Sequence, residues 1–117
     1  MSMYEPKEDI FSILSAITVE GLTITVYQQR PEADMSLPCY IFSVANNTPE
    51  YDLEGEIAFQ DGEINIDIFG NDSTETTSLL KALETGMIEQ GFQMSFSGEI
   101  PDPDGFSHVS TRFYFIY

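Results

Sequence analysis

The feature that most constrains the fold is a run of strict alternation at residues 63–69. Isoleucines and polar residues alternate there: Ile64, Ile66 and Ile68 stand among Glu63, Asn65 and Asp67. In a β-strand, successive side chains point to opposite faces, so each set occupies its own face. The run therefore predicts a strand whose isoleucine face lies in the core and whose polar face lies in water or at an interface.

A helix is predicted to follow this strand, after the polar break at 70–73. With Asp72 as N-cap, Glu75 falls at the position of a capping box. An apolar stripe then runs along one side of the helix: Leu79, Leu80, Leu83, Met87 and Ile88. Gly91 is a C-cap candidate that lets Phe92 fold back on the last turn. We expect the isoleucine face of the strand to pack under Leu79, Leu83 and Met87.

Periodicity and turn residues predict the remaining elements. A first helix is expected over 6–19, and strands over 22–27, 37–45, 92–97 and 107–117. The polar segments 28–36, 46–56 and 98–106 are expected to be loops. Residues 57–59 form either a short strand paired with 63–68 or the start of one long strand with a bulge near Asp61 and Gly62.

The order of these elements, α-β-β-β-α-β-β, indicates an α+β fold. It contains no regular βαβ repeat, so we expect an antiparallel or mixed sheet, mostly antiparallel, with two helices packed on one face. A chain of 117 residues fits one domain, and we expect that domain to span residues 1–117.

The strand at 37–45 is apolar on both faces. Tyr40, Phe42 and Val44 share one face, and Cys39, Ile41 and Ala45 share the other. Such a strand is covered on both sides, and a neighbouring subunit is a possible second cover. The candidate residues for a subunit interface or for an inner surface of an assembly are Tyr40, Phe42, Val44, Glu63, Asn65, Asp67, His108 and Arg112. The last two share a face of the final strand, where we expect them to pair with acids.

Charge and motif content argue against several functions. The chain carries 20 acidic against 4 basic residues, a net charge of −16, which opposes binding to nucleic acid and to anionic membranes. The single cysteine, Cys39, allows no intrachain disulfide and is expected to be buried. His108 has no nucleophile motif around it, and the acidic loops match no calcium-binding loop. We therefore expect no catalytic site, no metal and no cofactor.

Three segments together carry a resemblance to a known family: INIDIFGND, LLKALETGMIEQGF and FSHVSTRFYF. They resemble the small tail proteins of long-tailed bacteriophages, namely tail terminators and related head–tail joining or tail-completion proteins. The shared pattern is an Ile-Asp-Ile-Phe strand at 66–69, a helix ending in Gly91–Phe92, and a final strand with His108, Arg112 and Phe113. The upstream segment LPCYIFSVANNTPEYDLEGE also fits, so the likeness spans about residues 37–117.

The resemblance implies a structural protein without enzymatic activity. Members of this kind form a ring of identical subunits, typically a hexamer, at the end of the tail tube. The implied partners are further copies of the chain, the major tail tube protein and the head–tail connector proteins. The implied location is the virion tail, assembled in the host cytoplasm, with DNA passing through the ring without sequence-specific binding. Alternatives are another head–tail connector or minor tail protein, an acidic DNA mimic that inhibits a nuclease and, last, an enzyme.

Overall fold

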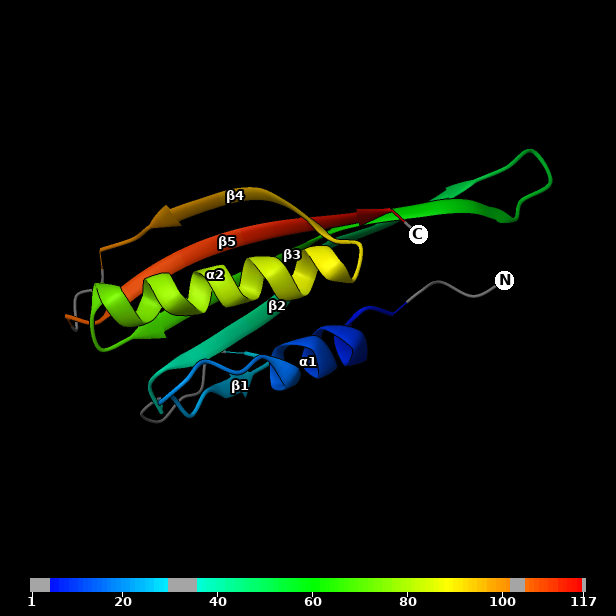
Figure 1. Cartoon of the computed structure of the whole chain (residues 1–117). Coiled ribbons are helices and arrows are strands. Elements are labelled where there is room, and N and C mark those ends of the chain that lie inside the picture. Colours follow the sequence, from blue (N-terminus) through cyan, green and yellow to red (C-terminus); the bar gives the residue numbers. More distant parts are fainter. Residues whose placement is uncertain (1–4, 30–35, 102–104, 117) are drawn as a thin grey trace.

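A computed structural model describes residues 5–29, 36–101 and 105–116 of the chain (Figure 1). Its elements follow the predicted order: α1 (Lys7–Ala16), β1 (Thr25–Tyr27), β2 (Cys39–Tyr51), β3 (Ile57–Gly70), α2 (Ser73–Glu89), β4 (Gln93–Glu99) and β5 (Ser107–Ile116). The predicted fold class, a small α+β domain with a mixed sheet and two helices, is confirmed.

The five strands form one sheet in the order β1-β2-β3-β5-β4. β1 runs parallel to β2, and every other pair in the sheet is antiparallel. The register places Ile66 of β3 between Phe42 of β2 and Thr111 of β5. Both helices contribute buried residues to a single core cluster on the same face of the sheet, and within the described residues the opposite face carries no helix (Figure 1).

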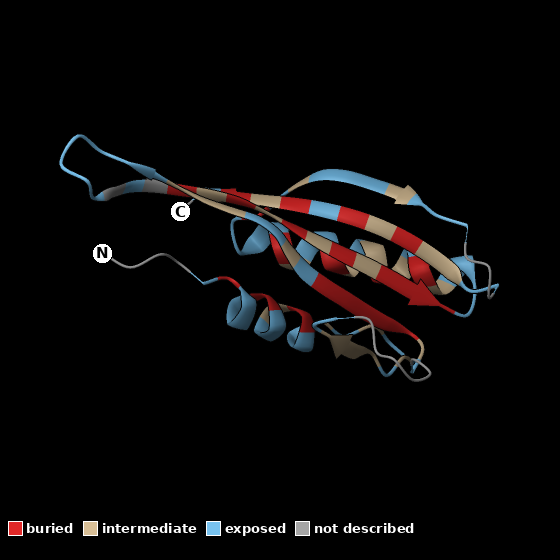
Figure 2. Ribbon diagram, turned by 180° about the vertical axis from the view of Figure 1, so that it is seen from behind, coloured by how far each residue is buried: buried red, intermediate tan, exposed pale blue. Residues whose placement is uncertain are grey.

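The core lies between this sheet face and the two helices. Ile64, Ile66 and Ile68 are fully buried in one cluster with Leu79, Leu83 and Met87 of α2, as predicted. The prediction is wrong for Ile88, which was placed in the same stripe and is 51 % exposed. Buried and less buried positions alternate along β3 and β5, which is the period of two expected of strands that are covered on one face (Figure 2). The other cluster members are Ile10, Leu14, Tyr40, Phe42, Leu79, Leu83, Met87, Phe92, Val109, Phe113 and Phe115.

Both ends of α2 form as the sequence predicts. The Asp72 carboxylate accepts a hydrogen bond from the Glu75 N–H at 2.8 Å, and the Glu75 carboxylate accepts one from the Asn71 N–H at 3.1 Å. Gly91 adopts φ +92°, and its N–H donates to the Ile88 carbonyl at 3.0 Å. The Phe92 N–H reaches the Met87 carbonyl at 3.1 Å, which completes a Schellman motif.

The N-terminal elements are shorter than predicted. α1 ends at Ala16 rather than at residue 19, because Ile17 already has extended backbone angles. Val19 and Leu22 pair in an isolated bridge around Gly21, whose φ is +80°. This tight turn occupies the start of the predicted strand 22–27, so only Thr25–Tyr27 joins the sheet.

The largest difference from expectation is the length of the β2–β3 hairpin. Most of the predicted loop 46–56 is strand, and β3 is one continuous strand, which was one of the two alternatives for residues 57–59. The expected bulge at Asp61 and Gly62 is wrong, because both residues pair in register with β2. The pairing is irregular at two other places, between Val44 and Asn46 and between Glu50 and Tyr51 of β2. A Cβ at Gly62 would lie 2.4 Å from the Asn46 carbonyl oxygen and 2.7 Å from the Phe115 ring.

Residues 46–60 of this hairpin form a two-stranded arm that projects away from the helices (Figure 1). The arm accounts for the elongated shape of the molecule, whose extents are 52 × 27 × 22 Å. Among the described residues, the arm has no third strand, since β1 pairs only with Cys39–Ile41 and β5 reaches β3 no further than Asp61.

Candidate functional site

The helix-free face of the sheet holds five of the predicted interface residues. On β3 these are Glu63, Asn65 and Asp67, and on β5 they are His108 and Arg112. The Arg112 Nε donates to the Asn65 Oδ1 at 3.1 Å and lies 3.8 Å from the Glu63 Oε2. The His108 Nε2 lies 3.2 Å from the Asp67 Oδ1. The expected pairing of both basic side chains with acids is confirmed.

These pairs differ in how far they are shielded from water. The His108 side chain is 14 % exposed, and its ring stacks on Phe69 with centroids 4.1 Å apart. The side chains of Arg112 and Glu63 are both about half exposed, a setting in which an ion pair contributes about 0–1 kcal/mol. The pairs therefore act mainly to fix the positions of side chains on this face, and they leave its outer surface polar.

Tyr40, Phe42 and Val44 do not belong to that face. The prediction of an outward interface is wrong for Tyr40 and Phe42, which are fully buried beneath the helices, while Val44 packs partly buried against the same cluster. The Tyr40 hydroxyl donates to the Leu79 carbonyl at 2.7 Å. Burial raises the pKa of this hydroxyl well above its ordinary value.

The second apolar face of β2 is covered by residues of the chain itself. Cys39, Ile41 and Phe69 form a separate buried cluster, and Tyr27 and Leu37 pack against it partly buried. The buried Cys39 was predicted. No neighbouring subunit is therefore needed to explain why this strand is apolar on both faces.

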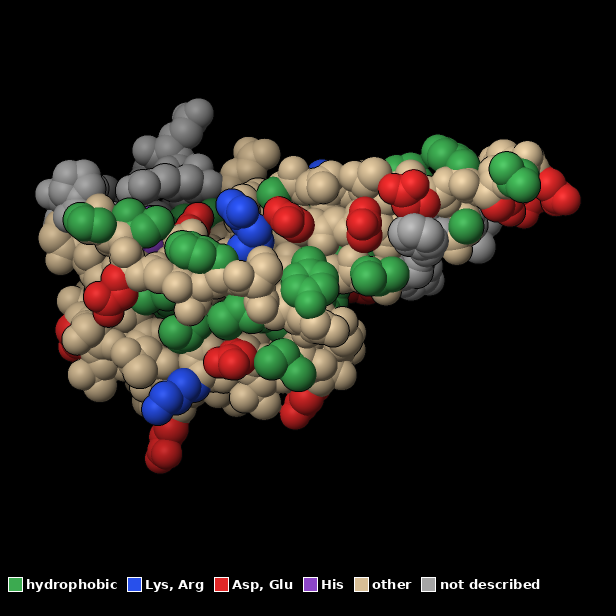
Figure 3. Space-filling view, turned by 90° about the horizontal axis from the view of Figure 1, so that it is seen from above, with side chains coloured by type: hydrophobic (Ala, Val, Ile, Leu, Met, Phe, Trp, Pro, Cys, Tyr) green, Lys and Arg blue, Asp and Glu red, His purple; other side chains and the backbone are tan. Residues whose placement is uncertain are grey.

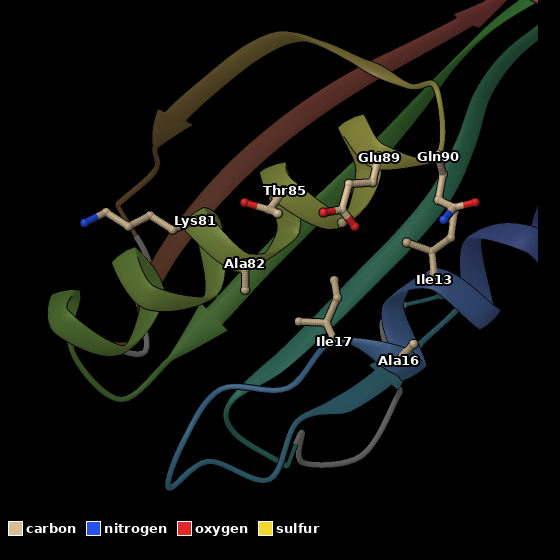
Figure 4. A pocket seen from close by; sticks show the side chains of 9 residues that line it. Ile13, Ala16, Ile17, Lys81, Ala82, Thr85, Glu89 and Gln90 are labelled. Atoms are coloured by element: carbon tan, nitrogen blue, oxygen red, sulfur yellow. The ribbon is translucent and has the colours of Figure 1, made fainter.

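A groove between the two helices was not anticipated from the sequence. It encloses about 470 Å³, and nine residues line it: Ile13, Ala16, Ile17, Lys81, Ala82, Thr85, Gly86, Glu89 and Gln90 (Figure 4). A Cβ at Gly86 would lie 3.4 Å from the Ile17 side chain, which is about van der Waals contact, so Gly86 faces the segment at the end of α1. The groove thus has an apolar floor, with Lys81, Glu89 and other polar groups at its rim.

The tip of the arm is the second feature that the sequence did not reveal. The Asp52 Oδ1 accepts hydrogen bonds from the N–H groups of Glu54 at 2.9 Å and Glu56 at 3.0 Å, which orders the turn. Leu53 is fully exposed and Tyr51 is 62 % exposed. Hydrophobic and acidic side chains therefore stand together at the end of the arm (Figure 3).

The described part of the chain holds no cluster suited to catalysis by a metal. No three His, Cys, Asp or Glu side chains within residues 5–29, 36–101 and 105–116 group as metal ligands. Asp102 and Asp104, two acids of the predicted loop 98–106, lie outside the described residues. Neither α1 nor α2 is long and apolar enough to cross a membrane.

Comparison with known proteins adds no assignment. Neither a family model nor a curated protein sequence matches this chain. What remains for a functional proposal is the sequence pattern set out above and two surface features, the acidic arm with its exposed apolar tip and the groove between the helices.

Proposed function

We propose that this protein is a structural subunit of a bacteriophage tail that acts as a tail terminator. Copies of the chain form a ring at the end of the tail tube, stop its growth and present a surface to the head connector. The observation that carries the proposal is the arm. Its residues 46–56 belong to the segment 37–56 that resembles the family, and it projects from a domain whose core is complete without it.

An arm of this kind has a cost for an isolated subunit. A two-stranded ribbon is marginally stable alone in water, and its free edges invite contact with other chains. The arm also exposes Tyr51 and Leu53 rather than burying them. Such a feature is useful to a protein whose working form is an assembly, because the neighbouring subunit covers what the single chain leaves exposed.

The charge of the chain supports the same role. A ring of subunits that each carry −16 has a wall that repels the phosphates of DNA, so DNA can pass without binding. The polar face with Glu63, Asn65 and Asp67 is a candidate for that wall or for contact with a neighbour. The absence of a metal cluster among the described residues is compatible with a structural role and does not itself argue for one.

Electron microscopy of tails assembled without this protein tests the proposal. Tubes longer than normal are expected, and adding the purified chain should restore the normal length. Tubes of normal length that fail to join heads would instead indicate a head–tail connector. Normal, complete virions would overturn both roles. Light scattering after size exclusion, with and without tube ends, provides the accompanying measurement of ring formation.

A further inference from the structure

We infer that the arm tip of one copy seats in the helix groove of the next copy. This contact rests on the proposed ring assembly, for which it supplies the joint between subunits. It brings together two exposed surface features of the folded monomer. These are the arm tip, which is apolar and acidic, and the groove, which has an apolar floor and a lysine at its rim.

The tip has the chemistry of an inserted segment. Leu53 and Tyr51 point into solvent from a turn that the Asp52 carboxylate holds in shape. Over residues 50–56 the tip carries four carboxylates and no basic residue. That charge repels nucleic acid and anionic membranes, so a protein surface is the favoured partner for its apolar residues.

The groove has the size and chemistry to accept this tip. Its volume of about 470 Å³ lies within the range of about 300–1,000 Å³ that is usual for ligand pockets. Its floor is formed by Ile13, Ile17 and Ala82, which matches an aliphatic or aromatic side chain.

Lys81 places a positive charge at one side of the groove, opposite in sign to the carboxylates of the tip. It is one of only four basic residues in the chain, and among the described residues it forms no ion pair. Glu89 also lies at the rim and opposes the approach of acids, so the tip carboxylates should lie toward Lys81 (Figure 4).

The placement of the two features makes the contact head-to-tail. The arm extends away from the helices, so its tip does not lie over the groove of its own chain (Figure 1). Each copy therefore offers one tip and one groove to different neighbours. Contacts of this heterologous kind produce a closed ring if the rotation between subunits closes, and an open chain of subunits if it does not.

Cysteine cross-linking tests the contact directly. Equal amounts of two single variants, Leu53→Cys and Ala82→Cys, are mixed and oxidised, and mixed dimers joined through these two positions are expected. The double variant should give a ladder of dimers, trimers and longer species. Each single variant alone should give at most a small amount of dimer. The wild-type chain serves as background, because its Cys39 is fully buried. If Ala82→Cys fails to fold, Thr85→Cys at the exposed rim replaces it.

Charge reversal provides an independent measurement. Lys81→Glu should weaken self-association about 5-fold, whereas Lys7→Glu makes the same charge change on α1 outside the groove and should alter it less than about 2-fold. Adding Glu54→Lys to the Lys81→Glu chain should recover most of the loss. Equal weakening by the two lysine variants would overturn the assignment of the groove.

The outcomes separate this contact from the proposed function. If tubes are overlong without the protein but no mixed dimer forms, the joint is wrong and the terminator role stands. If mixed dimers form but tails lacking the protein are normal, the joint stands and the role is wrong. A cross-link from Leu53→Cys to the tail tube protein, with none to another copy, would also overturn the inference.

Discussion

Replacing Tyr40 with phenylalanine tests whether this residue belongs to the core, as described, or to a surface between subunits. The Tyr40 ring is fully buried, and its hydroxyl donates to the Leu79 carbonyl at 2.7 Å. The substitution keeps the ring and removes the hydrogen bond. A typical bond of this kind contributes about 1 kcal/mol, and the Leu79 carbonyl, inside α2, retains its bond within the helix. Tyr40→Phe should therefore unfold about 1 kcal/mol more easily at pH 7.

Alkaline pH should reverse this order. Burial raises the pKa of Tyr40 in the folded state above its ordinary value of 10.0. The unfolded chain then loses this proton before the folded chain does, so the contribution of Tyr40 to stability is full below pH 10 and falls as pH rises toward the folded pKa. By pH 11 this loss exceeds the contribution of about 1 kcal/mol from the hydrogen bond, so the stabilities of the wild type and the phenylalanine variant should cross between pH 10 and pH 11.

The assay is urea unfolding of both proteins followed at several values between pH 7 and pH 11. Other tyrosines and lysines titrate equally in the two chains, so the difference between the curves isolates Tyr40. If the unfolding free energies of the two proteins change in parallel with pH, the Tyr40 hydroxyl is not buried. If the Tyr40→Phe variant keeps its stability but associates with itself more weakly, Tyr40 belongs to the subunit interface and not to the core.

Three further substitutions test the base of the arm, the helix cap and the core. Gly62→Ala should cost about 1–3 kcal/mol, because its Cβ would meet the Asn46 backbone, and an unchanged urea midpoint would contradict that close approach. Asp72→Ala should cost about 1 kcal/mol, and Asp72→Asn, which keeps an acceptor for the Glu75 N–H, should recover most of it in the same assay. Leu83→Ala should lower the unfolding free energy by about 2–5 kcal/mol, whereas Ile88→Ala, on the exposed side of α2, should change it by less than about 0.5 kcal/mol; similar losses would mean that the helix faces are misassigned.

Local signals in the sequence were sufficient for the central part of the fold. The ends of α2 depend on groups a few residues apart, such as Asp72 with Glu75 and Gly91 with Ile88, so their sequence pattern predicts them directly. The buried face of β3 at residues 63–68 follows from alternation alone, because a strand has only two faces and isoleucines occupy one of them over this run.

Features that depend on contacts between residues far apart in the sequence could not be predicted from local patterns. β2 is apolar on both faces, so its pattern cannot say that the helices cover Tyr40 rather than Ile41. The arm resembles a loop in sequence because it buries little and contains Pro49, a residue that edge strands tolerate. Ile17 and Lys81 both line the groove although more than half of the chain separates them, and no local sequence pattern predicts that they lie together.

Amide hydrogen exchange should be faster in the arm than in the rest of the sheet. Its ribbon is held by one ladder of cross-strand bonds, whereas the strands beneath the helices are paired and packed into the core. The arm can therefore open without unfolding the rest, and amides of residues 46–60 should exchange long before those of the Ile64–Ile68 strand. A partner that covers the arm must slow this exchange. The degree of protection of the arm amides therefore measures the fraction of chains that are assembled.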